Sequence, residues 1–200
     1  MLVNVVLDLD QTLISALTGE EYKWGENPEK EKKFRYHDMD SYYIIFERPK
    51  LQKFLDFLFQ NFNVSVWTAA SKDYALFIID KIILCNDKKG NPKNNRKLDY
   101  IFFSYHCNLS KKYKFGSKNL DMICNIYNIP GYTEKNTLII DDYDEVHETQ
   151  PERCILVKPF DFDKDGSEND KFLLKIIDEL KKLKDTKAEV KEANRNLGTI

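Results

Sequence analysis

The chain has 200 residues, of which 42% are hydrophobic and 32% are charged, and its formal net charge is −2. This composition predicts one soluble domain with a full core and excludes an intrinsically disordered chain. The near-zero net charge gives no strong nucleic-acid signal. No signal peptide and no apolar run of membrane-spanning length is recognisable, so we expect a cytoplasmic or nuclear protein, not secreted, with no membrane partner.

Short apolar runs alternate along the chain with segments of helical periodicity. We expect strands at the runs rich in β-branched and aromatic residues: 2–7, 64–67, 101–104, 137–141 and 154–158. We expect helices at the amphipathic segments: 50–62, 72–84, 117–128 and 168–183. This alternation is typical of an α/β fold, in which a parallel sheet is flanked by helices to give three layers, as in Rossmann-like proteins.

Residues 14–47, directly after the first strand, do not follow the alternation. The stretch 34–47 predicts a small β-hairpin insertion. Its aromatic residues either pack the hairpin onto the core or form a shelf for a substrate. The shelf hypothesis takes in Tyr36, Tyr42, Tyr43 and Phe46, with Tyr74 from the next predicted helix but one. We expect one domain over residues 1–184, followed by a polar tail at 185–200 that is frayed.

Two patterns that could suggest other metal sites or crosslinks do not hold. The four cysteines lie far apart without C-x-x-C spacing, so we expect free thiols rather than a zinc site or disulfides. Residues 161–166 begin like a calcium-binding EF-hand loop, but the twelfth position is Phe172 instead of the required glutamate. We therefore expect no calcium site there.

Polar side chains follow three of the predicted strands, at the point where each strand ends: Asp8, Asp10, Thr68, Asp141 and Asp142. Because the carboxyl ends of parallel strands share one edge of a sheet, we expect these groups to lie together. Four carboxylates repel one another unless cations neutralise them, and their hard oxygens suit Mg²⁺. Lys118, in the helix predicted from Ser117, is a candidate for the remaining positive charge.

Four segments, in this order, resemble the motifs of the haloacid dehalogenase (HAD) superfamily of aspartate-nucleophile phosphatases. They are "DLDQT" (8–12), "WTAAS" (67–71), Lys118 and "IIDD" (139–142). The stretch 46–75, with "IIDDYDEVHETQP" and "VKPF", is similar more narrowly to the phosphatases of the RNA polymerase II carboxyl-terminal domain (CTD), the NLI-interacting-factor-like group. The resemblance covers about residues 2–183 and implies a HAD-type phosphatase domain.

The resemblance implies a role for each acidic motif residue. Asp8 would be the nucleophile, forming an aspartyl-phosphate, and Asp10 would be the general acid and then the general base. In the resembling family, Mg²⁺ is held by residues that match Asp8, the backbone carbonyl of Asp10, and Asp142. The implied reaction is Mg²⁺-dependent hydrolysis of phosphoserine or phosphothreonine in a protein partner such as the RNA polymerase II CTD repeat.

The remaining matches imply supporting roles. Thr68 and Lys118 would hold the phosphoryl oxygens, Asp141 would pair with Lys118, and Thr12 would orient Asp10. The sequence departs from the family at Ser104, where members commonly carry arginine.

Three other functions stay open at this point. The chemistry would be the same if the substrate were a small phosphate ester or a nucleic-acid 3′-phosphate. A catalytically idle phosphopeptide-binding module is disfavoured because Asp8 and Asp10 are both present, and a scaffold acting through the aromatic hairpin is the third. A basic run is either a solvated loop or a contact for further phosphates on a multiply phosphorylated repeat: Lys88, Lys89, Lys93, Arg96 and Lys97.

Overall fold

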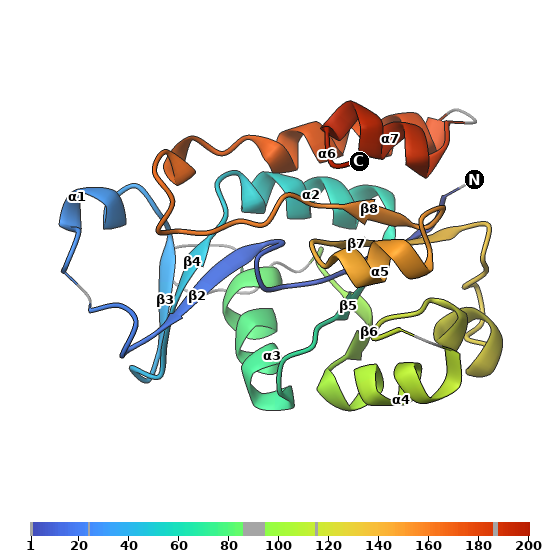
Figure 1. Cartoon of the computed structure of the whole chain (residues 1–200), viewed down its shortest axis with the longest axis horizontal. Helices are drawn as coiled ribbons and strands as arrows, with labels where there is room; N and C mark the ends of the chain where they lie inside the picture. Colours follow the sequence, from blue (N-terminus) through green and yellow to red (C-terminus); the bar gives the residue numbers. More distant parts are fainter. Residues whose placement is uncertain (1, 24, 86–94, 115, 186–187) are drawn as a thin grey trace.

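The computed structural model describes residues 2–23, 25–85, 95–114, 116–185 and 188–200 (Figure 1). The strands are β1 (Asn4–Leu7), β2 (Ile14–Thr18), β3 (Tyr36–Met39), β4 (Tyr43–Glu47), β5 (Asn63–Trp67), β6 (Leu98–Phe102), β7 (Thr137–Asp141) and β8 (Cys154–Leu156). The α-helices are α1 (Pro28–Glu31), α2 (Leu51–Asn61), α3 (Lys72–Ile78), α4 (Ser104–Lys114), α5 (Asp144–Thr149), α6 (Phe172–Asp185) and α7 (Val190–Leu197). The π-helical turns η1 (Ile79–Ile83) and η2 (Met122–Ile126) and the 3₁₀ turn η3 (Ser167–Asn169) complete the described elements.

The described part of the chain forms a five-stranded parallel sheet in the order β6-β5-β1-β7-β8. Asn4 of β1 lies opposite Asn63 of β5 and Thr137 of β7, so β1 occupies the centre. The predicted α/β fold is confirmed. Because β1 is central, the loop that follows it emerges in the middle of the carboxyl edge, flanked by the loops after β5 and β7.

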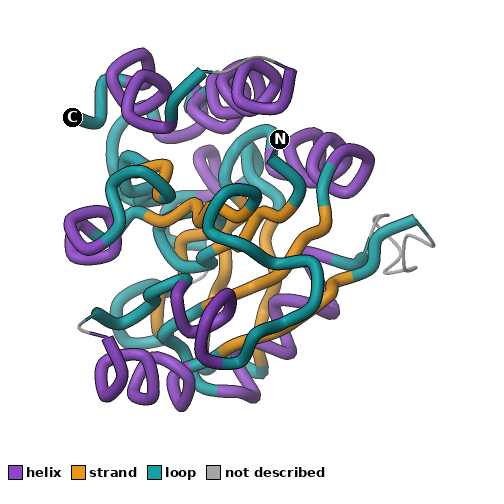
Figure 2. The backbone as a smooth tube through the Cα atoms, turned by 90° about the vertical axis from the view of Figure 1, so that its right-hand side faces the viewer, coloured by secondary structure: helices purple, strands orange, loops and turns teal. Residues whose placement is uncertain are grey.

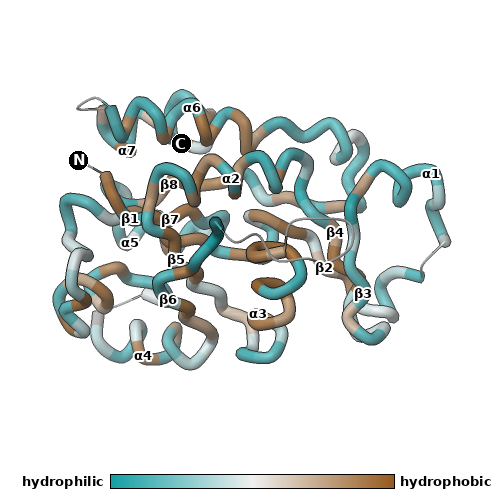
Figure 3. The backbone as a smooth tube through the Cα atoms, turned by 180° about the vertical axis from the view of Figure 1, so that it is seen from behind, coloured by the Kyte–Doolittle hydropathy of each residue, from teal (hydrophilic) through white to brown (hydrophobic). Residues whose placement is uncertain are grey.

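Helices cover both faces of this sheet (Figure 2). Along β1, Val5 and Leu7 join the core cluster that also contains residues of α2 and α6, whereas Val6 joins the cluster formed with η2 and α5. This alternation follows from the two-residue period of a strand. Both faces of β1 are therefore buried, which explains its uninterrupted apolar sequence. The central strand β1 is correspondingly hydrophobic in Figure 3.

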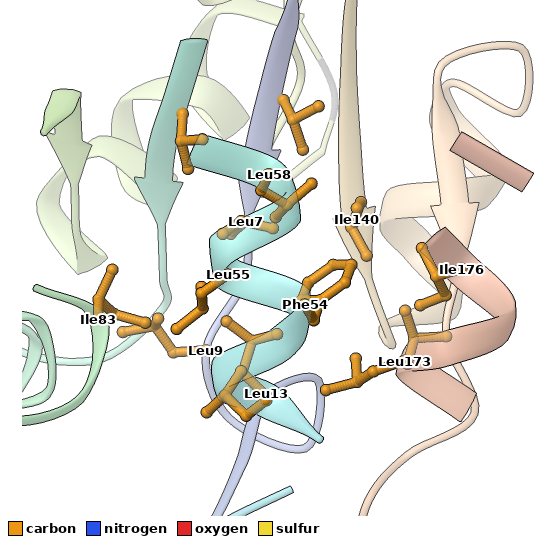
Figure 4. Close-up of a cluster of buried hydrophobic side chains, with 14 of the residues drawn as sticks. Leu7, Leu9, Leu13, Phe54, Leu55, Leu58, Ile83, Ile140, Leu173 and Ile176 are labelled. Atoms are coloured by element: carbon orange, nitrogen blue, oxygen red, sulfur yellow. The ribbon is translucent and has the colours of Figure 1, made fainter. Parts of the chain in front are cut away.

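The larger core lies under α2 and α6 (Figure 4). Phe54, Leu55 and Leu58 of α2 are fully buried next to Leu7, as the predicted amphipathic face requires. Burying each such side chain stabilises the fold by about 1.5–3 kcal/mol before the loss of chain entropy. Among the described helices, none combines the length and apolar character needed to cross a membrane.

The insertion contains the predicted hairpin, β3 and β4, and one further strand, β2, which pairs with β4. Phe46 is fully buried and stacks on Phe162 with ring centroids 3.6 Å apart. Tyr22 and Phe34 contact the same two rings edge-on. The expectation that Phe46 contributes to an exposed shelf is therefore wrong, because its ring forms the small core of the insertion.

The described part of the C-terminal segment, residues 188–200, is not frayed, contrary to our expectation. It contains α7, which packs against α6 and β8 and buries Ala193, Asn194 and Leu197. The Asn194 amide accepts a hydrogen bond from the Leu156 backbone N–H at 3.0 Å and donates one to the Cys154 carbonyl at 2.8 Å. Sequence composition did not predict this packing, because only a few residues of the polar helix are buried.

Candidate active site

The loop after β1 places its two aspartates on the same side of the chain. Asp8 still donates its backbone N–H to the Ile140 carbonyl of β7, at 3.0 Å, while Leu9 between the aspartates is fully buried in the core. Gln11 then adopts a positive φ of 57°, which turns the chain toward β2. Asp8 and Asp10 consequently line one cavity of about 410 Å³. The apolar strand therefore ends in two carboxylates without burying them in the hydrophobic core.

Lys118 lies between two carboxylates. Its Nζ is 2.5 Å from Asp8 Oδ1 and 2.8 Å from Asp141 Oδ2, and all three residues are buried. Burial lowers the pKa of the lysine, but the two neighbouring negative charges outweigh burial and raise it well above its ordinary value. Lys118 therefore stays charged, and it holds the Asp8 carboxylate in a fixed position.

The local structure around Lys118 differs from the predicted helix starting at Ser117. Lys118 lies in a turn before η2, and the Ser117 hydroxyl donates to Glu145 of α5 at 2.6 Å instead of capping a helix. Gln150, just after α5, donates to the Lys118 carbonyl at 2.7 Å and accepts from the Leu120 N–H at 3.0 Å. Sequence reasoning missed both of these α5-side supports.

Three carboxylates form a candidate metal site. Asp8, Asp141 and Asp142 each offer an oxygen, and these oxygens all lie within 4.8 Å of one another. Burial and the charge of Asp8 raise the pKa of Asp142, which means that they disfavour its ionised form. A nearby cation would stabilise that ionised form. Hard carboxylate oxygens in this number suit Mg²⁺. The residues present therefore fit a divalent cation.

Contrary to our expectation, the Thr12 side chain does not bind Asp10. Its hydroxyl donates to Asp142 Oδ1 at 2.9 Å, and its carbonyl accepts a hydrogen bond from Arg48 Nη1 at 3.0 Å. The fully buried Arg48 also pairs with Asp170, just before α6, at 2.9 Å. Thr12 thus fixes Asp142, and Arg48 fixes the loop that carries Thr12.

The Asp10 side chain is held by Tyr74 of α3. The Tyr74 hydroxyl donates to Asp10 Oδ1 at 2.6 Å. Burial raises the pKa of Asp10 to about 6, although this hydrogen bond lowers it. Tyr43 of β4 contacts the Tyr74 ring edge-on at 5.2 Å, so the insertion reaches Asp10 through two aromatic rings. We had placed Tyr74 only in the hypothetical shelf, and its contact with Asp10 was not anticipated.

The rest of the cavity is built by segments after β5 and β6. Thr68 follows β5 as predicted, is buried, and lines the cavity. Its hydroxyl accepts a hydrogen bond from the Ala70 N–H at 3.1 Å. Ser104, the position at which the family resemblance led us to expect arginine, lies at the start of α4 and also lines the cavity. α4 contributes further lining residues that sequence reasoning missed: Cys107, Asn108 and Lys111.

The predicted basic run is only partly described, and of its described residues Lys97 is exposed. Lys88, Lys89 and Lys93 lie outside the described residues. Arg96 is buried, pairs with Asp56 at 2.8 Å, and donates to the Ile83 carbonyl at 2.8 Å. Its guanidinium thus connects α2 to η1, which is a structural role.

Comparisons with known proteins identify the family of the chain. Residues 3–191 match the NLI interacting factor-like phosphatase family. Two relatives named as CTD phosphatase-like protein 355R are each 44% identical to the chain. The one from Invertebrate iridescent virus 6 aligns over 88% of this chain and 96% of its own length. The one from Invertebrate iridescent virus 3 aligns over 86% and 91%.

A solved structure shows the same fold. The fission yeast RNA polymerase II CTD phosphatase Fcp1, bound to beryllium fluoride, aligns over 92% of this chain with a TM-score of 0.52 and 20% identity. The present chain spans 50% of the length of that chain. At this identity the likeness concerns the fold alone, and the family follows from the match over residues 3–191. The chain therefore belongs to the NLI interacting factor-like phosphatase family.

Proposed function

We propose that the chain is a Mg²⁺-dependent phosphatase acting on phosphoserine or phosphothreonine in proteins, with the RNA polymerase II CTD repeat as its substrate. One observation carries this proposal: the Asp8 carboxylate is fixed by Lys118 in a cavity that is also lined by Asp10, whose carboxylate is held by Tyr74. A nucleophile and a proton donor thus face the same space. We assign this chemistry to a catalytic domain over residues 1–184.

In the first step, an Asp8 oxygen attacks phosphorus in line and forms a new P–O bond. The bond from phosphorus to the serine or threonine oxygen breaks, and Asp10 donates a proton to that leaving oxygen. A pKa of about 6 suits this role, because a useful fraction of Asp10 is protonated near neutral pH. The product of this step is an aspartyl-phosphate on Asp8 and a free hydroxyl on the protein substrate.

In the second step, Asp10 removes a proton from water and the resulting hydroxide attacks the same phosphorus. The bond to Asp8 breaks, inorganic phosphate leaves, and Asp10 is protonated again for the next cycle. Lys118 and Thr68 bind the phosphoryl oxygens during both steps. Asp141 keeps Lys118 in place through the 2.8 Å ion pair.

Magnesium would be held by Asp8, the backbone carbonyl of Asp10, and Asp142. When bound, Mg²⁺ supplies positive charge that offsets the clustered carboxylates and the transferring phosphoryl group. Thr12 supports this site by fixing Asp142.

A protein substrate is supported by the aromatic residues beside Asp10. Tyr43 is half-buried and contacts Tyr74, which binds Asp10, so these two rings offer an apolar shelf next to Asp10. Tyr36 is not part of this shelf, contrary to the prediction, because it pairs with Phe46 and its ring lies on the opposite face of the small sheet. The two viral relatives are also named as CTD phosphatase-like. If the shelf binds peptide, Tyr43→Ala raises KM for a CTD phosphopeptide more than KM for p-nitrophenyl phosphate. Equal changes for both substrates would remove the shelf from the proposal.

The purified chain should be assayed against a CTD phosphopeptide, nucleoside 3′-phosphates and p-nitrophenyl phosphate, with Mg²⁺ and with a chelator. We expect release of phosphate from the peptide only with the metal. Preferred hydrolysis of 3′-phosphates would instead select the nucleic-acid alternative, and phosphopeptide binding without any turnover would select the idle binding module. Beryllium fluoride with Mg²⁺ should place the phosphoryl mimic on Asp8, and a mimic on another side chain would refute that assignment.

A further inference from the structure

One face of α4 forms a wall of the catalytic cavity. The lining residues occur at helical spacing along this face: Ser104, Cys107, Asn108 and Lys111. The first three are neutral, and the last carries a positive charge. Ser104 and Lys111 are separated by about 10 Å along the helix axis, from a rise of 1.5 Å per residue. The wall therefore changes from neutral near Thr68 to cationic farther along the helix.

Two lysines line this cavity among the described residues, Lys111 and Lys118, and they differ in their partners. Lys118 is buried and occupied by Asp8 and Asp141. Lys111 is exposed and forms no ion pair with a described residue. Its own helix offers no counter-charge, because α4 contains no aspartate or glutamate. Lys111 thus presents an unused positive charge to a cavity whose other ionised walls are mostly carboxylates.

A lysine in the last turn of a helix also stabilises that helix through its dipole. Lys112 meets that need equally well, since it lies in the same turn and is exposed, but it does not line the cavity. The dipole therefore does not account for the direction in which Lys111 faces. Lys112 provides a matched control for every effect of charge on α4 alone.

We propose that Lys111 binds a second anionic group on the substrate, so that the site prefers phosphopeptides with another phosphate or carboxylate near the phosphate that is removed. This inference rests on the proposed function and specifies its substrate class. An extended peptide advances about 3.3 Å per residue, so the roughly 10 Å of wall corresponds to about three residues. The carboxylates that line the cavity repel a second anionic group on the substrate, whereas the Lys111 ammonium pairs with it directly.

The test compares kcat/KM for peptides of one sequence that carry a single phosphoserine, a second phosphoserine three residues before or after it, or glutamate at those positions. Each peptide is assayed with the wild type, Lys111→Ala, Lys111→Glu and the control Lys112→Ala. The readout is the ratio of kcat/KM between doubly and singly anionic peptides, so a general loss of activity cancels. The phosphoserine and glutamate arms separate phosphate recognition from simple carboxylate recognition.

We expect the wild type to favour a doubly anionic peptide about fivefold, the scale of one exposed charge pair, and to lose this preference at high ionic strength. Lys111→Ala should abolish the preference mainly through KM, Lys111→Glu should reverse it, and Lys112→Ala should retain it. Equal kcat/KM for all peptides with the wild type, or equal losses in the two alanine variants, would overturn the inference while leaving the proposed function intact. Failure of the wild type to hydrolyse even p-nitrophenyl phosphate would overturn both, and would locate the error in the proposed function.

Discussion

The strand-edge site and the insertion at residues 14–47 both bury side chains, but they bury different kinds of groups. At the strand edge the buried groups are charges, with Lys118 between Asp8 and Asp141. In the insertion they are rings, with Phe46 stacked on Phe162. Clustered carboxylates oppose folding unless they are paired, whereas packed rings favour it.

This difference indicates that the strand edge carries the reactive groups and that the insertion carries packing groups. The strand edge keeps unfavourable charges that a reaction can use, and the insertion keeps a small aromatic core that packs its sheet against Phe160 and Phe162. The two regions meet where Tyr43 contacts Tyr74 and Tyr74 holds Asp10. Substitutions on the two sides of that contact should therefore separate loss of activity from loss of stability.

The largest expected effect is that of Asp8→Asn. An amide cannot form the acyl phosphate, so we expect turnover to fall by at least about 10⁴-fold, in line with other deletions of a covalent nucleophile. The folded structure should persist, because Lys118 retains Asp141. Circular dichroism and thermal melting check the fold, and phosphate release checks the activity. A folded Asp8→Asn variant with wild-type activity would exclude Asp8 as the nucleophile.

Asp10→Asn should come next, with kcat reduced about 10²–10⁴-fold through loss of proton transfer. The loss should be greater for a phosphoserine peptide than for p-nitrophenyl phosphate, since a serine alkoxide needs a proton more than nitrophenolate does. Parallel kinetics on the two substrates measure this difference. The same loss on both would argue that Asp10 does not act as the general acid.

The insertion should respond in the opposite way. Phe46→Ala removes a fully buried, stacked ring and should lower the free energy of unfolding by about 3–5 kcal/mol. Tyr42→Ala in the same hairpin is the control, because Tyr42 keeps 75% of its surface exposed and its loss should change stability little. Urea unfolding followed by fluorescence measures both. Similar stabilities for the two variants would mean that the aromatic core contributes little.

The smallest effect, at the contact between the regions, is a shift in pH dependence. The Tyr74 hydrogen bond lowers the pKa of Asp10, so Tyr74→Phe should raise that pKa above about 6. Because the general acid must be protonated, the decline of kcat/KM on the alkaline side should move to higher pH in this variant. A pH profile with a phosphoserine peptide measures the shift. A profile that moves to lower pH, or not at all, would contradict a direct influence of Tyr74 on Asp10.

Local sequence was sufficient where one segment determines the outcome. An apolar run ending in "DLD" predicted that Asp8 and Asp10 follow a buried strand, and the parallel sheet then brought Asp141 and Asp142 to the same edge. The position of Phe46 could not be read in this way. The run "YYIIFE" is apolar on both faces, and the partner ring of Phe162 comes from a distant part of the chain.

Long-range hydrogen bonds decided the other differences. Thr12 binds Asp142 rather than Asp10, because the turn at Gln11 and the Arg48 contact set its direction. Lys118 lies outside a helix because residues of a separate segment bind the backbone around it. Glu145 accepts a hydrogen bond from the Ser117 N–H, and Gln150 donates one to the Lys118 carbonyl. α4 escaped prediction because its apolar periodicity is weak, so the residues that line the cavity from that helix could not be identified.

The contact between Asn194 and β8 has a consequence for how copies of the protein behave toward one another. β8 is an edge strand, and the outward N–H of Leu156 and carbonyl of Cys154 would otherwise be available to a strand from another molecule. The Asn194 amide supplies one acceptor and one donor and thereby takes the place of that strand. Removing α7 would expose these unpaired backbone groups of β8 to edge-to-edge pairing between molecules, so we expect α7 to reduce aggregation.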